Sequence, residues 1–140
     1  MADWVDGVLR HLADAGLVDY DPDGITGDSF SDVMPAIPNE VVVLTPYGGP
    51  EPDSKLPYDT PNLQVRTRAE ADPRVARARA WAIYNELNGL ARTALPNGTW
   101  LVLCTANQTP QTMGQDTLGR PEYVVNFALE LHAPSVNRPA

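Results

Sequence analysis

The sequence has little of what would build a disulfide framework, a basic surface or a membrane span. Its one cysteine, Cys104, excludes an intrachain disulfide and a four-cysteine zinc site. One lysine, Lys55, and a formal net charge of -8 argue against tight wrapping of DNA and against binding to an anionic membrane. No apolar segment approaches the roughly 20 residues that span a bilayer. We therefore expect a protein that folds in a reducing cytoplasm without contacting a membrane.

Motifs for catalysis or cofactor binding are also missing. The sequence contains no G-x-S-x-G, no H-E-x-x-H and no phosphate-binding glycine loop followed by a helix. Residues 114–119 begin and end with glycine, but they link two expected strands and so lack the helix N-terminus that binds anions. Cys104 alternates with apolar neighbours and is expected to be buried, while His11 and His132 are far apart in the sequence. We expect a protein that is not an enzyme and holds no cofactor.

One acidic segment matches the start of a calcium-binding loop. Residues 19–24 read Asp-Tyr-Asp-Pro-Asp-Gly, but the twelfth position of such a loop, which should be a bidentate acid, is Phe30. The other interpretation is an acidic turn in which carboxylates accept backbone N–H groups. Because the closing ligand is absent, we predict no metal site, and a small calcium-binding module remains an alternative.

The hydrophobic periodicity predicts two helices. The first is expected from about Trp4 to Ala15, after an Asp3 cap. The second has the clearer start, because Asp72 precedes a proline at the first helical position, and it continues to about Leu90.

The same analysis predicts about four strands, separated by long loops. The strands are expected at 40–45, 63–68, 100–105 and 122–132; residues 31–34 could form one helical turn, 46–61 and 108–120 are expected to be loops, and the tail from Ala133 is expected to be loose. The sequence therefore predicts a single α/β (α+β) domain over residues 1–140, with a mainly antiparallel sheet flanked by two helices.

Two of these strands suggest self-association. Residues 41–44 and 100–104 are apolar at every or nearly every position, so they need cover on both faces of the sheet. Two helices can cover one face. The other face must then be covered by loops or by another subunit, which is the main argument from the residues for an oligomer.

Several exposed positions are candidates for that contact. Trp81 falls on the polar face of the second helix with Arg74 and Arg77. It either stacks on Arg77, a cation–π contact worth about 0.5–1 kcal/mol, or forms a subunit contact. Arg66 and Arg68 line one face of their strand, as a solubility device at a sheet edge or as a surface for acidic neighbours.

Four segments, taken in order, resemble the tail terminator or minor capsid proteins of long-tailed bacteriophages. They are Glu40 to Gly49, Pro61-Asn-Leu-Gln-Val-Arg-Thr-Arg68, the helix from Asp72, and Gly114-Gln-Asp-Thr-Leu-Gly-Arg-Pro-Glu-Tyr-Val-Val-Asn126. The resemblance covers roughly residues 37–131. One departure is Gln115, since this family often has arginine before the acid. Asp116 is still expected to pair with Arg120.

This resemblance implies a structural virion protein that assembles in the host cytoplasm. Such proteins form a homohexameric ring at the head–tail junction, where the ring terminates the tail tube and connects it to the head. The implied partners are further copies of the chain, the tail tube protein and a head-completion or stopper protein. DNA would pass through an acidic lumen without specific binding. The alternative within virion proteins is a head-completion, stopper or other neck protein.

A closed ring needs two different contact surfaces on each subunit. We expect the helix with Trp81, Arg77 and Arg74 and the strand with Arg66 and Arg68 to contribute to one of them. The arm 46–61, with Tyr47, and the loop 108–120, with Asp116 and Arg120, are expected to reach neighbouring subunits.

Overall fold

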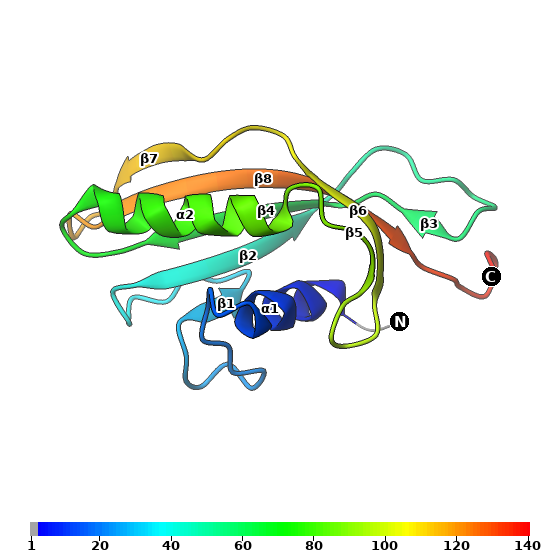
Figure 1. Cartoon of the computed structure of the whole chain (residues 1–140), viewed down its shortest axis with the longest axis horizontal. Helices are drawn as coiled ribbons and strands as arrows, with labels where there is room; N and C mark the ends of the chain where they lie inside the picture. The colour runs from blue at the N-terminus through cyan, green and yellow to red at the C-terminus, as the bar shows by residue number, and fades with distance from the viewer. Residues whose placement is uncertain (1–2) are drawn as a thin grey trace.

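The computed structural model describes residues 3–140. These residues form two helices and one open, mixed sheet of eight strands (Figure 1). The elements are α1 (Trp4–Asp14), β1 (Ser29–Ser31), β2 (Val41–Tyr47), β3 (Tyr58–Asp59), β4 (Asn62–Arg68), α2 (Pro73–Leu87), β5 (Ala91–Ala94), β6 (Trp100–Ala106), β7 (Gln111–Gln115) and β8 (Pro121–His132). The α+β class is as predicted, but the count of about four strands is wrong.

The long strand β8 organises the sheet. The strand order is β1-β2-β4-β8-β6-β5, and β3 and β7 also pair with β8. On one side, β8 pairs with β4 and then β3; on the other side, it pairs with β7 and then β6. Every pairing is antiparallel except that of β1 with β2. The twelve residues of β8 are therefore held between two neighbours along most of their length.

Both helices start as the sequence predicts and cover the same face of the sheet. The Asp3 carboxylate accepts the N–H of Val5 at 3.0 Å, and the Asp72 carboxylate accepts the N–H of Arg74 at 3.0 Å, each satisfying a free N–H of the first turn. The core between helices and sheet is formed by α1 (Val5, Val8, Leu9, Leu12), α2 (Ile83, Leu87) and the inward residues of β2, β4, β6 and β8. In residues 3–140, no helix is long and apolar enough to cross a membrane.

Four sequence predictions about the connections are wrong. Residues 31–34 form no helical turn, because Ser31 ends β1 and pairs with β2. The expected loop 108–120 contains β7, whose five exposed residues lack the apolar alternation that marks a strand. Two short strands, β3 and β5, were also missed. The tail is held in place, since Arg138 donates to the Asp59 carboxylate at 2.9 Å.

Candidate subunit interface

The face of the sheet that points away from the helices, here called the back face, divides into two halves. The register places Val41, Val43, Arg66, Arg68, Glu122 and Val124 in one half. We call it the covered half, because residues 32–40 lie over it and its two valines from β2 have no exposed surface. The loop therefore provides the second cover that the sequence required for residues 41–44.

Arg68 holds this loop in place. Its guanidinium donates to the carbonyl oxygens of Pro35 and Pro38 at 2.7 Å and of Asn39 at 3.1 Å. Only 3% of Arg68 is exposed, and burial lowers its pKa. Of the two interpretations of Arg66 and Arg68, a solubility device at a sheet edge is wrong, because β4 lies between β2 and β8.

Arg66 is also engaged within the subunit. It donates to the Glu122 carboxylate at 3.0 Å across the β4–β8 pair, and it approaches the sulfur of Met34. The acidic neighbour that we expected on another subunit is thus supplied by the adjacent strand. Neither arginine of β4 is free for a contact between subunits.

The expected pair of Asp116 and Arg120 is formed at the turn between β7 and β8. Arg120 Nε donates to Asp116 Oδ2 at 2.7 Å, and a second N–H reaches the carbonyl of Ala36 at 2.6 Å. The Asp116 carboxylate also accepts the backbone N–H groups of Arg120 and Leu118, and the first of these bonds contributes most to lowering its pKa. Arg120 is 8% exposed, so it anchors the covering loop instead of reaching outward.

The other half of the back face has no cover from the described residues. We call it the bare half; its residues are Tyr47, Tyr58, Gln64, Trp100, Leu103, Thr105, Asn126, Ala128, Glu130 and His132. Tyr47 and Trp100 are both 43% exposed, and Leu103 is 38% exposed. Tyr47 lies at the end of β2 instead of in the arm, and its hydroxyl donates to Asn126 at 3.2 Å. Large apolar side chains gathered on an open sheet face indicate a contact surface.

A shallow hollow of about 200 Å³ lies within the bare half. Thr60, Leu103, Thr105, Ala128, Leu129 and Glu130 line it. Glu130 forms no ion pair or side-chain hydrogen bond with any residue in 3–140. The hollow therefore combines apolar walls with one carboxylate that has no cationic partner within this range.

The outer face of α2 carries the predicted helix residues. Trp81 is 39% exposed and packs edge-on against Tyr84, with ring centroids 5.3 Å apart. The predicted stacking on Arg77 is not formed; among the described residues the cation–π contact joins Arg10 and Tyr20. Arg74 pairs with Asp72 at 2.9 Å, whereas Arg77 is exposed.

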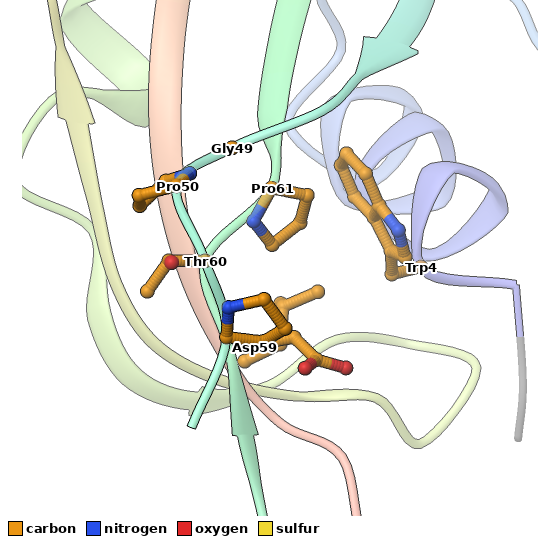
Figure 2. A pocket seen from close by; sticks show the side chains of 8 residues that line it. Trp4, Gly49, Pro50, Asp59, Thr60 and Pro61 are labelled. Carbon is orange, nitrogen blue, oxygen red and sulfur yellow. The ribbon is translucent and has the colours of Figure 1, made fainter. Parts of the chain in front are cut away.

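A larger hollow of about 350 Å³ lies between α1 and the arm (Figure 2). Trp4 faces Pro61 across it, and Asp59 is the one titratable side chain in its lining. That carboxylate is already paired with Arg138. A Cβ on Gly49 would lie 1.9 Å from the carbonyl oxygen of Thr60, so only glycine fits where the arm meets β2. The hollow offers no pair of acid and base groups for catalysis.

In the acidic turn at 19–24, the central carboxylate, Asp21, accepts hydrogen bonds from backbone N–H groups close to it in the chain. Asp21 accepts the backbone N–H groups of Asp23 at 2.9 Å and of Thr26 at 3.0 Å, and the bond from Thr26 contributes most to lowering its pKa. In residues 3–140, no three histidine, cysteine, aspartate or glutamate side chains are grouped to hold a metal ion. These contacts match the Asx-turn interpretation.

Comparison with known proteins agrees with the resemblance seen in the sequence. Residues 11–132 match the family model described as "Bacteriophage tail terminator protein". No curated protein matches the chain. The family match spans well over half of the chain and includes every strand named above and α2. The chain therefore belongs to the bacteriophage tail terminator family and is a structural component of phage tails.

Proposed function

We propose that this protein forms a homo-oligomeric ring, a hexamer, that terminates the tail tube and joins it to the head. Family membership supports the tail assignment. The observation that carries the ring is the bare half, where Tyr47, Trp100 and Leu103 are each about two-fifths exposed on the same face of the sheet. Burying such a surface against another copy lowers the free energy of the assembly at roughly 25 cal/mol per Å² of apolar area.

A terminator ring acts as a cap and as a connector. One side binds the last ring of the tail tube protein and blocks further addition, and the other side binds a head-completion or stopper protein. Each subunit therefore makes unlike contacts above, below and on both flanks, which a heterologous closed ring allows. We assign the protein to the head–tail junction of the virion, with assembly in the host cytoplasm.

The negative charge of the chain supports a role around moving DNA. The net charge is -8, and six of the nine arginines are engaged by carboxylates of the same chain, namely Arg10, Arg66, Arg74, Arg79, Arg120 and Arg138. An acidic lumen repels phosphate groups, so DNA passes through it without binding. A basic lumen in the assembled ring would overturn this part of the proposal.

The direct experiment is to add the purified protein to tail tube protein while the tubes polymerise. We expect shorter tubes, each with a ring density at one end in electron micrographs, and a length that falls as the protein concentration rises. A control variant, Ile25→Asp, should shorten the tubes as the wild type does, because it changes a side chain that is 81% exposed and lies outside the bare half. Unchanged tube lengths, with the protein bound instead to the head vertex, would favour a stopper protein.

A further inference from the structure

We propose that neighbouring subunits meet through α2 of one copy and the bare half of the next. In this contact, Trp81 enters the hollow beside Leu103, and Arg77 pairs with Glu130. The inference rests on the proposed ring and names the surfaces that close it. The other surfaces we had expected, on β4 and at Arg120, are already used within the subunit.

The sheet side of the contact has an apolar hollow beside a carboxylate, so it can accommodate an apolar side chain next to a cation. Leu103, Thr105 and Ala128 form a shallow apolar wall around a hollow of about 200 Å³. Glu130 is half-buried at its margin and has no cationic partner among the described residues. A partly buried carboxylate is costly unless a cation pairs with it. A guanidinium supplies that positive charge together with directed hydrogen bonds.

The helix side presents the complementary groups. Trp81 follows Arg77 by four residues, so both side chains project from the same face of α2, one turn apart. The small side chain of Ala78 lies between them on this face and allows the helix to approach a flat surface. Tryptophan and arginine are among the residues enriched at the hot spots of protein interfaces.

The distribution of charge favours a second copy of this chain as the occupant. Arg74 and Arg77 are the exposed charged residues of α2, whereas Arg79 and Glu86 are half-buried and pair with Asp28 and His11; the chain as a whole has a net charge of -8. Arg74 is paired with Asp72, so Arg77 is the exposed cation of this helix that has no ion-pair partner among the described residues, and Glu130 lies on the opposite side of the sheet. One subunit cannot join its own two surfaces, so the contact repeats from copy to copy until a ring closes.

A charge exchange between two variants tests this pairing. Arg77→Glu and Glu130→Lys each place like charges across every contact, so each variant alone should assemble at least about tenfold more weakly than the wild type. Mixed in equal amounts, they should form rings with alternating subunits, because every contact then joins opposite charges. The helix of an Arg77→Glu subunit meets the sheet of a Glu130→Lys subunit in the exchanged order, and the next contact joins the native Arg77 and Glu130. Assembly is measured by native mass spectrometry and by ring density on tube ends. Arg92→Glu and Glu70→Lys are the matched controls, both at exposed positions outside the two surfaces.

The double variant Arg77→Glu with Glu130→Lys sharpens this exchange, because every contact in its ring again joins one cation and one carboxylate. It should recover assembly to within about threefold of the wild type, which corresponds to the return of one opposite-charge pair per contact. Rescue in the double variant supports the pairing. Normal rings from either single variant, or no rescue in the double variant, would overturn it while the wild-type ring and the proposed function stand.

Two further outcomes separate the contact from the proposed function. A wild-type protein that forms no ring on tube ends would overturn the proposed function and this contact together. If both single variants form normal rings and lose only tube binding, the occupant of the bare half is the tube protein, which also overturns the pairing.

Cross-linking provides a second measurement that does not depend on charge. The double variant Trp81→Cys with Leu103→Cys should yield, on oxidation, a ladder of covalent multimers up to the ring number. Each single variant should yield no ladder. The native Cys104 is 1% exposed, so it does not contribute to the cross-links. A ladder from the double variant supports the contact, and its absence in assembled wild-type-like rings would overturn it.

Discussion

The two halves of the back face are built on the same strands, β4 and β8, yet they are completed in opposite ways. The covered half places Arg66 and Arg68 under residues 32–40 of the same chain. The bare half exposes Trp100 and Leu103. Residue type alone would predict the opposite exposure on this face, because here the charged side chains are buried and the large apolar side chains are exposed. Burial of each half is determined by whether a loop of the same chain covers it.

The largest effect is expected from removing the anchor of the covered half. Arg68→Met keeps the length of the side chain but removes the N–H groups that three or more loop carbonyls accept. Each hydrogen bond from a charged donor contributes about 1.5–3 kcal/mol. We expect the free energy of unfolding to fall by about 4 kcal/mol in urea titrations, allowing for partial compensation by water.

The matched control for Arg68 is Arg92→Met on β5. Arg92 is exposed and belongs to neither half of the back face. Its replacement should change the free energy of unfolding by less than about 0.5 kcal/mol. A loss below about 1 kcal/mol for Arg68→Met would mean that the loop covers the sheet without its arginine.

A second comparison uses two leucines of β6 that point to opposite faces. Leu101 is 1% exposed and belongs to the core, whereas Leu103 is 38% exposed in the bare half. Leu101→Ala should cost about 3 kcal/mol of stability, and Leu103→Ala less than about 1 kcal/mol in the monomer. Ring assembly should respond in the opposite order, with Leu103→Ala the more damaging change. Equal losses of stability would place Leu103 in the core.

The sequence predicts the helices and the long strands well because their signals are local. The caps at Asp3 and Asp72 and the alternation along β8 depend only on neighbouring residues. The short strands were missed for the converse reason, since β7 consists of Gln-Thr-Met-Gly-Gln and is held by pairing with β8. These residues form a strand because they pair with β8, and that long-range pairing leaves no hydrophobic period in the local sequence.

Local signals also predict that two of the candidate interface residues are exposed. Trp81 and Arg77 lie on the exposed face of α2 because helical spacing determines which face a residue occupies. The placement of Arg68 depends on a loop that lies far earlier in the sequence and reaches it through three carbonyl groups. The hollow beside Glu130 requires the register of β6 with β8, including a shift between Leu101 and Leu103. Such a shift cannot be derived from residue types.

Acid should lower the stability of the protein through three carboxyl groups, those of Asp116, Asp21 and Asp6. The pKa values of Asp116 and Asp21 are lowered chiefly by backbone N–H groups. Burial opposes the change at Asp6, but hydrogen bonds from Tyr20 and Arg10 still lower the pKa of that carboxyl. A folded-state pKa below the unfolded value of about 3.9 gives stability that is present above this pH and is lost as the pH falls through the folded pKa.

The response to acid should begin at the β7–β8 turn. Asp116 holds Arg120, which in turn donates to the covering loop. Hydrogen exchange at about pH 3 should therefore accelerate in residues 32–40 before it does so in β8. Asp116→Asn should flatten the dependence of the urea midpoint on pH between about 5 and 3. An unchanged dependence in this variant would remove the turn from the acid response.

The smallest effect concerns thiol reactivity and tests which side of β6 is open. Cys104 is buried in the core, and burial raises its pKa to about 12. We expect it to react with a disulfide reagent only when the protein unfolds, since the thiolate is the reactive form. In Leu103→Cys, the replaced side chain faces the bare half, so the introduced thiol should react in the folded monomer. Addition of excess wild-type protein should then protect that thiol if the bare half is an interface between copies. Protection by tube protein alone would instead mean that the bare half contacts the tube, and the open side of the sheet would lie at the end of the ring instead of between its subunits.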